Sequence, residues 1–390
     1  MRVAFVYRNL NRSGSLERDT LYLVEGLVRR GVELHCYCDP GTSIDLDGVV
    51  RHDIVPVTRS RSRIGYPLLR WSFALRATRA LRAARHEFDL VHVLGVSAWE
   101  HDVVHVPAVM AGEQARWPRQ GGYGYRAAGL RARLSPLLRP EVATVRSIER
   151  LQFRPGRYLR VTAVTEQVRD DLIEVHGVRA EHIDIVPPAV EVARFARAQD
   201  GRLRKALAIE PDASVVLFVG HAFERKGLAD AIAALTACPS SAHLVVVGGG
   251  EAAAYKKEAE ALGVAPRVHF VGKVDSPEDY YAAADLLVLP TRSDPWGIPV
   301  IEAMAAGIPV VTTRAAGSAS VAVAAGSGLV VPARSPRELG EAVSALLGDS
   351  DRRRKMGERG RAGAARFDIE PIVDMTLETY SRALADRTKR

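Results

Sequence analysis

Two carboxylates follow an apolar run near residue 290. The stretch LLVLPTRSDPWGIPVIEAMAAGIPVV, residues 286–311, begins as a buried strand and then carries Asp294 and Glu302. We expect Asp294 in a loop after the strand and Glu302 one turn inside a helix that begins near Pro299. Carboxylates accept hydrogen bonds from sugar and ribose hydroxyls. The alternative is that both acids only stabilise the loop and the helix start, and the spacing alone leaves both interpretations open.

The backbone of the same loop could bind an anion. Free N–H groups around Trp296, Gly297 and the first helical turn would point toward a phosphate, and the helix dipole would favour its negative charge. A phosphate and a sugar hydroxyl could therefore be bound side by side at this loop.

A basic pair follows a second apolar run. In VVLFVGHAFERKGLADAIAAL, residues 215–235, a loop carries His221, Arg225 and Lys226 ahead of Gly227 and a helical pattern. Two cations where a strand leads into a helix could bind a diphosphate without a metal ion. Basic residues are also common in surface loops, so this pattern alone does not decide the function.

Two glycine-bearing turns carry less information. The loop RNLNRSGSLERD contains Gly14 and Ser15 but lacks the G-x-G-x-x-G spacing, which disfavours an NAD-dependent oxidoreductase. The run Gly248–Gly250 allows a tight turn and close approach of a ligand, yet such turns are common without one.

Three histidines, His92, His101 and His105, lie close together in the sequence with Asp102. They could be metal ligands, but their spacing matches no metalloenzyme pattern, and a structural role is the commoner case for each. We therefore predict no metal site.

The elements that position these residues alternate between short β-branched runs and longer helical patterns. One such helix covers residues 16–29 and ends before Gly31. Continuous apolar strands separated by amphipathic helices indicate parallel sheets covered on both faces. The predicted strands form two series, at residues 3–7, 34–38, 90–93, 103–106, 161–164 and 183–186, and at 215–220, 244–247, 268–271, 286–289, 310–312 and 329–331. The chain is therefore predicted to be α/β, with two doubly wound Rossmann-like domains.

A proline-containing, polar stretch separates the two series. We place the linker at about 187–200, an N-terminal domain at 1–190 and a C-terminal domain at 191–370. A final helix at about 371–390 is expected to pack back on the first domain.

The formal charge of the 390-residue chain is +8, and the excess is local arginine. Residues 59–85 contain no acid, and residues 116–160 carry eleven arginines against Glu141 and Glu149. Arginine interspersed with aromatic residues suits an anionic membrane surface or an anionic acceptor. A solvated arginine-rich surface is the equal alternative, whereas nucleic acid is disfavoured because no binding motif accompanies the charge.

Neither a membrane-spanning run nor a secretory signal is visible in the sequence. The three cysteines, Cys36, Cys38 and Cys238, are too few and too unevenly spaced for a disulfide framework. We therefore expect a cytoplasmic protein, with peripheral contact at the inner face of the membrane as an open alternative.

Together these stretches resemble the retaining glycosyltransferases of family four, a bacterial group that includes lipopolysaccharide-core glucosyltransferases and phosphatidylinositol mannosyltransferases. DPWGIPVIE resembles the family's pair of acids separated by seven residues, with Asp294 in place of the first glutamate. VGHAFERKG matches its phosphate loop, and GSLERD resembles its N-terminal glycine loop. The resemblance covers nearly the whole chain and implies a GT-B fold, with two Rossmann-like domains facing a deep cleft.

The resemblance also implies roles for individual residues. Arg225 and Lys226 would hold the donor diphosphate, Glu302 the nucleotide ribose and Asp294 the donor sugar. His105 would face the donor sugar and the acceptor. The remaining donor contacts would come from Gly14, Ser15, His221, Gly272, Lys273, Val274, Trp296, Gly297 and Ile298.

Three departures from the family pattern bear on these roles. Asp294 is one methylene shorter than glutamate, which could change the sugar that is bound. His221 stands where many members have arginine, which weakens a second phosphate anchor. The segment AAGSASVA, residues 315–322, replaces the usual glycine-glutamate segment, which leaves its role in the nucleotide pocket open.

The implied activity is transfer of a hexose-type sugar from a UDP- or GDP-linked donor to a hydroxyl of a lipid, surface-glycan or natural-product acceptor. The family retains anomeric configuration and needs neither a metal nor a cofactor. The N-terminal domain would bind the acceptor and the C-terminal domain the nucleotide sugar. The alternatives are a nucleotide-sugar epimerase, a sugar phosphorylase, and a non-catalytic nucleotide-sugar-binding scaffold.

Overall fold

A computed structural model describes residues 1–10, 15–41, 46–60, 62, 65–113, 140–196 and 203–389. These residues form two compact units. Unit 1 contains the described residues up to 189 together with 369–389, and unit 2 contains those within 190–368. The sequence-based boundaries were 190 and about 370. Among the described helices, none is both long and apolar enough to cross a membrane.

Unit 1 is built on a seven-stranded sheet in which every pair is parallel, in the order β3-β2-β1-β4-β5-β6-β7. Its strands are β1 (Arg2–Val6), β2 (Glu33–Cys38), β3 (Val49–Asp53), β4 (Leu90–Leu94), β5 (Val103–Val106), β6 (Arg160–Ala163) and β7 (Ile183–Ile185). The order reverses between β1 and β4, as in doubly wound sheets that bind ligands at that point.

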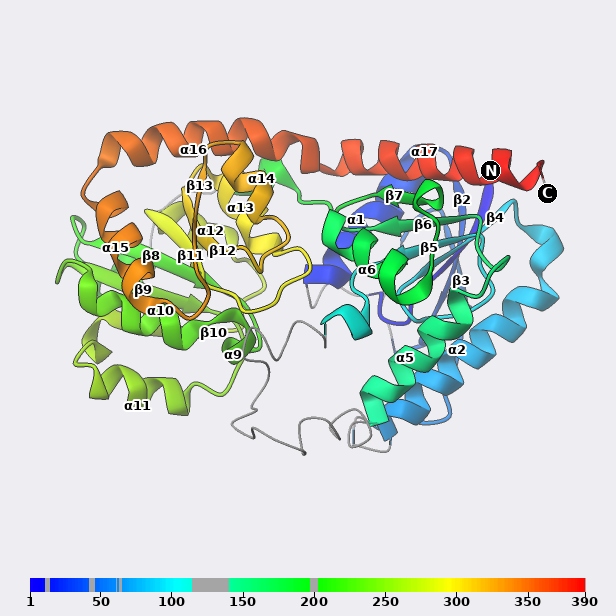
Figure 1. Cartoon of the computed structure of the whole chain (residues 1–390), viewed down its shortest axis with the longest axis horizontal. Helices are drawn as coiled ribbons and strands as arrows, with labels where there is room; N and C mark the ends of the chain where they lie inside the picture. The colour runs from blue at the N-terminus through cyan, green and yellow to red at the C-terminus, as the bar shows by residue number, and fades with distance from the viewer. Residues whose placement is uncertain are drawn as a thin grey trace. The chain divides into compact units, whose positions relative to one another are not determined.

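Helices cover both faces of this sheet (Figure 1). They are α1 (Ser15–Arg29), α2 (Gly65–Ala83), α5 (Pro140–Gln152), α6 (Glu166–His176) and α17 (Ile369–Arg387), with 3₁₀ turns at Arg85–Glu87 and Ala180–His182. Alternate residues of β1 point to opposite faces: Val3 and Phe5 pack in the cluster with α1 and α17, and Ala4 and Val6 in the cluster with α2.

Strand β3 was missed by the sequence analysis. It lies at the sheet edge, and its central residues Val50 and Arg51 are exposed. An edge strand that buries little surface does not need the apolar run that identified the others. The other twelve strands were predicted within one or two residues of their observed bounds.

Unit 2 repeats the same architecture with six parallel strands in the order β10-β9-β8-β11-β12-β13. They are β8 (Ser214–Val219), β9 (Ala242–Val247), β10 (Val268–Gly272), β11 (Leu286–Leu289), β12 (Val310–Thr313) and β13 (Gly328–Val331). The prediction of two doubly wound parallel-sheet domains is therefore confirmed. In unit 2 the order reverses between β8 and β11.

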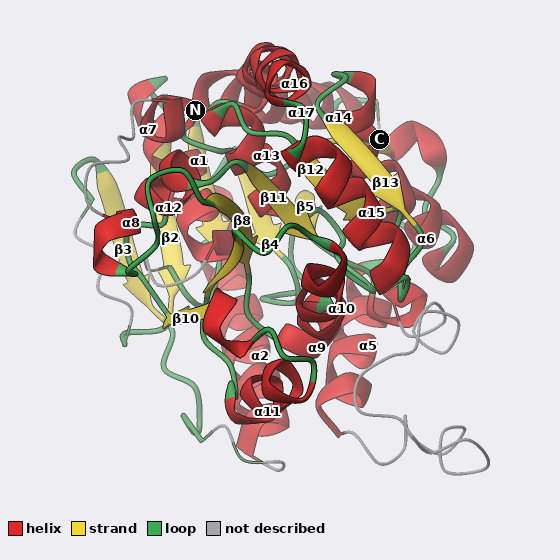
Figure 2. Cartoon of the chain, turned by 90° about the vertical axis from the view of Figure 1, so that its left-hand side faces the viewer, coloured by secondary structure: helices red, strands yellow, loops and turns green. Residues whose placement is uncertain are grey.

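The helices of unit 2 are α7 (Val192–Ala196), α8 (Leu203–Ala206), α9 (Phe223–Lys226), α10 (Leu228–Ala234), α11 (Ala253–Ala261), α12 (Glu278–Ala283), α13 (Ile298–Ala306), α14 (Ala319–Ala324), α15 (Pro336–Leu347) and α16 (Ser350–Ala364). Single 3₁₀ turns lie at Leu235–Ala237, Ala265–Arg267 and Ala365–Phe367. In Figure 2 the strands β8 and β11 lie between α13 and α10.

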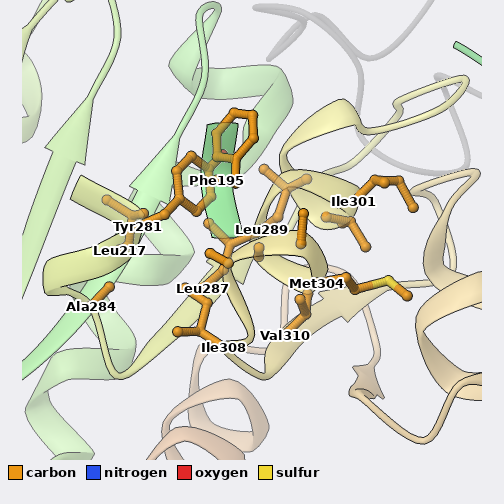
Figure 3. Packing of buried hydrophobic residues seen from close by; sticks show 14 of the residues in the cluster. Phe195, Leu217, Tyr281, Ala284, Leu287, Leu289, Ile301, Met304, Ile308 and Val310 are labelled. Carbon is orange, nitrogen blue, oxygen red and sulfur yellow. The ribbon is translucent and has the colours of Figure 1, made fainter. Parts of the chain in front are cut away.

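Two apolar clusters fill the space on either side of the second sheet. Leu217 of β8 packs with α13 in one cluster, whereas Val216 and Phe218 pack with α10 and α15 in the other. Figure 3 shows the first cluster, in which Tyr281 and Phe195 pack with the β11 residues Leu287 and Leu289. This core fixes the start of α13 beside the end of β11, where the two predicted acids lie.

Candidate functional site

The predicted residues of unit 2 gather at one edge of its sheet. Arg225 and Lys226 follow β8, and Asp294 follows β11, the two strands between which the strand order reverses. Open parallel sheets bind ligands beyond the carboxyl ends of their strands at this reversal. The topology therefore indicates a ligand site at these loops.

Lys226 and Asp294 form a buried ion pair. The Lys226 ammonium donates a hydrogen bond to Oδ2 of Asp294, and the two side chains are only 9% and 10% exposed. Arg225 Nη1 lies 4.0 Å from Oδ1 of Asp294 and donates to the carbonyl of Ser293 at 2.6 Å. Two cations and one carboxylate thus share this site, which leaves an excess of positive charge at the loop.

The electrostatics of the pair follow from burial and charge. Burial alone would raise the pKa of Asp294, but the positive charges of Lys226 and Arg225 hold it below its ordinary value. Hydrogen bonds from Lys226 and from the backbone N–H of Trp296 act in the same direction. Asp294 is therefore a carboxylate at neutral pH and can accept hydrogen bonds from hydroxyl groups.

A close backbone approach holds the basic loop against the end of β11. Gly227 has φ +78°, and a Cβ atom there would lie 2.1 Å from the carbonyl oxygen of Pro290. The carbonyl of Arg225 accepts hydrogen bonds from the backbone N–H of Arg292 at 2.8 Å and from the Thr291 hydroxyl at 3.1 Å. Glycine is required at 227 because any side chain would separate these loops.

The segment after β12 fixes the Asp294 loop. The N–H of Asp294 donates to the carbonyl of Ala315 at 2.9 Å, and the N–H of Gly317 donates to the carbonyl of Asp294 at 3.0 Å. Ser318 donates from its N–H to Trp296 at 2.7 Å and from its hydroxyl to Gly297 at 3.1 Å. Residues 315–318, whose role the sequence left open, thus position the loop that carries Asp294.

Glu302 lies inside α13 and is buried, with 5% exposure. The hydroxyl of Tyr281, on α12, donates to its Oε2 at 2.6 Å. Tyr281 was not predicted from the sequence because it is one aromatic residue among the apolar positions of a short helix, without a motif of its own. Its partner becomes visible only when α12 and α13 pack together.

Trp296, Gly297 and Ile298 lie where the sequence placed them, at the start of α13. Gly297 precedes the helix with φ +88°, and Ile298 is its first residue. The Trp296 ring is buried against Phe367, with centroids 5.4 Å apart. The backbone N–H of Trp296 donates a hydrogen bond to the Asp294 carboxylate, so this residue orients the carboxylate as well as the loop.

The other predicted donor residues lie at the same edge of the sheet. His221 is exposed and directly follows Gly220 at the end of β8. Gly272 ends β10, its carbonyl accepts from Gly248 at 2.8 Å, and Lys273 after it is exposed. Val274 packs against the core of the unit. Residues that follow the carboxyl ends of β8, β9, β10 and β11 therefore lie together on one side of the sheet.

His105 lies elsewhere, inside the sheet of unit 1. It is 4% exposed in β5, its Nδ1 lies 2.9 Å from the Thr162 hydroxyl oxygen, and burial lowers its pKa to about 4. This position favours a structural role and gives no support to the prediction that it faces the sugar. His92 is similar, with Nδ1 2.6 Å from the Tyr380 hydroxyl oxygen. Over the described ranges, no three His, Cys, Asp or Glu side chains converge as a metal site.

Two predicted features are only partly covered by the described residues. Gly14 lies outside them, and Ser15 begins α1 without a described side chain. Residues 116–139 of the second basic segment also lie outside them.

The first basic segment forms much of α2, and several of its arginines have partners within unit 1. Arg76 donates to the carbonyl of Val55 at 2.6 Å, and Arg82 pairs with Glu100 at 2.8 Å. Arg70 bonds to the Tyr66 hydroxyl at 2.8 Å. Membrane contact through this segment therefore stays a prediction, with fewer available cations than the sequence indicated.

Comparison with known proteins assigns each half of the chain to a family model. Residues 16–194 match the model described as Glycosyltransferase Family 4, and residues 199–363 match Glycosyl transferases group 1. A relative from Segniliparus rotundus, the D-inositol 3-phosphate glycosyltransferase, is 30% identical over 75% of this chain and 68% of its own length. The enzyme of the same name from Nocardia farcinica is 32% identical over 58% of this chain, which spans only 53% of that enzyme.

Solved structures share the fold over nearly the full length. WaaG, a glycosyltransferase of lipopolysaccharide biosynthesis, has a TM-score of 0.76 at 23% identity, covering 96% of this chain and 98% of its own. HepE from Anabaena, solved with UDP and glucose, has a TM-score of 0.71 at 18% identity, covering 98% and 99%. With both units matched and a relative aligned over most of its length, the chain belongs to the GT-B glycosyltransferases of family four.

Proposed function

We propose that this protein transfers a hexose-type sugar from a nucleoside-diphosphate sugar to a hydroxyl of an acceptor, with retention of anomeric configuration and without a metal ion. The observation that carries the proposal is the buried Lys226–Asp294 pair beside Arg225 at the point where the strand order of unit 2 reverses. Family membership supports the reaction class. HepE was solved with UDP and glucose, which supports a UDP-linked sugar as the first donor to test.

The pair suits a diphosphate that must leave with extra negative charge. Burial lowers the pKa of Lys226, and Asp294 offsets part of the cost of burying its ammonium group. A donor diphosphate would compete for Lys226 and Arg225, and the carboxylate of Asp294 would then be available to the sugar hydroxyls. Cations fixed before reaction stabilise the leaving diphosphate, an effect worth about 3–4 kcal/mol for a single positioned donor.

The bond changes balance without an enzymatic nucleophile. The anomeric carbon–oxygen bond to the diphosphate breaks, and the acceptor oxygen bonds to the same face of the anomeric carbon. The acceptor hydroxyl gives its proton to the departing phosphate oxygen. Glu302, held by Tyr281, would accept hydrogen bonds from the ribose and position the donor.

The decisive experiment is the slow hydrolysis of a panel of UDP- and GDP-sugars by the purified protein, with and without EDTA, following released nucleoside diphosphate. We expect release from one donor, unchanged by EDTA, and lowered at least about 100-fold in Lys226→Ala and Glu302→Ala. Lys257→Ala, an exposed lysine on α11, is the matched control and should leave the rate unchanged.

The same assay separates the alternatives. An epimerase would return a changed sugar from the donor without any acceptor, and a phosphorylase would release a sugar phosphate when given inorganic phosphate. A scaffold would bind a donor calorimetrically and turn over neither donor nor acceptor. D-inositol 3-phosphate should be included among the acceptors, because the relatives are named for it.

A further inference from the structure

The basic residues of helix α16 fall into two groups that differ in their contacts. Arg353 donates to the carbonyls of Leu346 and Leu347 at the end of α15, and Arg361 donates to the carbonyl of Ala306 at the end of α13. Arg354 pairs with Asp351 and Glu358 on its own helix. These three arginines stabilise helix ends and the helix surface.

The other three cations, Arg352, Lys355 and Arg359, line a cavity of about 470 Å³. None of them forms an ion pair with any residue in the part of the chain that the structure describes. Their spacing, three and then four residues apart, places them on one face of α16, with successive Cβ atoms about 5–6 Å apart. Like charges gathered around a cavity repel each other unless an anion lies between them.

The cavity has a defined floor and a fixed wall. Met356 and Leu329 supply apolar surface, Gly326 lies in the turn before β13, and Gly328 is the first residue of that strand. The stem of Arg359 lies across this turn, since a Cβ atom on Gly326 would come within 3.2 Å of its Cδ and 3.3 Å of its Nη1. The Arg359 side chain therefore lies along this turn, and it remains exposed to solvent.

Two acids also line the cavity, and both are already engaged. Asp349 caps α16 by accepting from the backbone N–H of Arg352 at 2.8 Å, and Asp351 lies 3.5 Å from Arg354. A hydrogen bond from a backbone N–H leaves the negative charge of Asp349 in place, so the three cations and two acids around the cavity carry a net charge of +1. The helix N-terminus adds to it.

This cavity is separate from the candidate donor site. Gly326 and Gly328 lie at the amino end of β13, whereas Lys226 and Asp294 follow the carboxyl ends of β8 and β11. Because all strands of this sheet are parallel, the amino end of one strand and the carboxyl ends of the others lie on opposite sides of the sheet, one strand length apart. A ligand in the cavity would therefore not occupy the donor position.

We propose that this cavity binds a small phosphate-bearing molecule, with Arg352, Lys355 and Arg359 as its anion ligands. Guanidinium groups bind phosphate oxygens in pairs, and cations one helical turn apart suit two phosphate groups better than one. The volume lies within the range of small-molecule sites. The proposal does not rest on the transfer reaction proposed above.

The test is calorimetric titration with inorganic pyrophosphate at constant ionic strength. It uses the full-length Lys226→Met/Asp294→Leu protein as the parent, so that binding at the donor site is weakened without leaving a buried charge unpaired. We expect binding that becomes at least tenfold weaker in Lys355→Gln/Arg359→Gln. Lys257→Gln removes one positive charge from an exposed position on α11, outside the cavity, and should change the affinity less than twofold.

Equal binding by the parent and the double variant would overturn the proposal, as would equal losses in the double variant and in Lys257→Gln. Absence of any pyrophosphate binding to the parent would overturn it too. Thermal unfolding of each variant verifies folding, which these exposed positions should tolerate. A parallel titration with a hexose bisphosphate distinguishes the source: tighter binding than pyrophosphate indicates an organic ligand, and weaker binding an inorganic one.

Discussion

The hydroxyl of Tyr281 donates a hydrogen bond to Oε2 of Glu302 at 2.6 Å, and both residues are buried, the tyrosine at 0% and the glutamate at 5% exposure. This bond connects α12 to α13 and fixes the direction in which the carboxylate points. If Glu302 binds the donor ribose, Tyr281 is a positioning residue that affects donor binding through Glu302.

Tyr281→Phe should therefore raise the KM for the donor roughly tenfold, equivalent to about 1.4 kcal/mol, while kcat changes less than about twofold. The loss arises because a buried carboxylate loses a hydrogen bond and its fixed orientation. Steady-state donor kinetics measure the split between KM and kcat. Tyr280→Phe on the same helix is the control, and an equal KM change there would contradict the assignment.

Removing one member of the Lys226–Asp294 pair should destabilise the fold strongly. Asp294→Ala leaves the Lys226 ammonium buried beside Arg225, and we expect a loss of about 3–5 kcal/mol in the free energy of unfolding. Lys226→Met/Asp294→Leu should recover much of this loss without recovering activity. Urea unfolding measures both effects.

The exposed pair Arg337–Glu341 provides the matched control for that experiment. Its side chains are 85% and 57% exposed, so Glu341→Ala should cost less than about 1 kcal/mol. If the double variant at the buried pair were as unstable as the sum of its single variants, coupling between Lys226 and Asp294 would be excluded.

Gly227→Ala should be far more damaging than Gly263→Ala. Both glycines have positive φ, +78° and +68°, so alanine costs about 1–2 kcal/mol at either position. Only at 227 would the new Cβ meet a backbone atom, 2.1 Å from the Pro290 carbonyl oxygen, which should add roughly 1–3 kcal/mol. Equal midpoints of thermal unfolding would show that the loops do not approach as described.

Asp19 should impose a pH dependence on stability. Burial raises its pKa to about 7, against a partial lowering by the backbone N–H of Ala189. Between about pH 4 and 7 the folded state keeps a proton that the unfolded state has lost, so stability falls as pH rises, by up to about 1.4 kcal/mol per pH unit. Above pH 7 this contribution levels off.

Asp19→Asn removes that titration and keeps an oxygen that can accept from Ala189. The stability of the variant relative to the parent should therefore increase from pH 5 to pH 8, measured by urea unfolding at several pH values. Buried His92 and His105 have pKa values lowered to about 3 and about 4, so they make stability rise with pH. This contribution is the same in the parent and the variant and cancels in the comparison. Parallel curves for the parent and Asp19→Asn would refute the prediction.

The sequence was most informative where burial is complete. Runs such as residues 286–289 are apolar throughout because parallel strands are covered on both faces, so the sheets, their two series and the carboxylates after β11 could be predicted. Strand β3 could not, because its exposed residues need no apolar pattern.

The missed parts of the site depend on contacts between residues distant in sequence. Tyr281 reaches Glu302 only through the packing of α12 on α13, and Ser318 reaches Gly297 only because β12 lies beside β11. The role that the motif resemblance implies for His105 stays a prediction: His105 is buried within β5, and burial is a property that the resemblance does not report. A local pattern records residue type and spacing, not which side chains the fold encloses.

Helix α17 has a consequence for synthesis on the ribosome. Val373 and Tyr380 belong to the core of unit 1, and a Cβ atom on Gly26 of α1 would lie 2.3 Å from Val373 Cγ2. Unit 1 therefore cannot complete its core until residues beyond Asp368 have been translated, whereas all of unit 2 precedes them. At roughly 5–20 residues per second, the nascent first unit would wait about 10–40 s with the α17 face of its sheet uncovered. In this chain the unit that begins first is the last to finish folding.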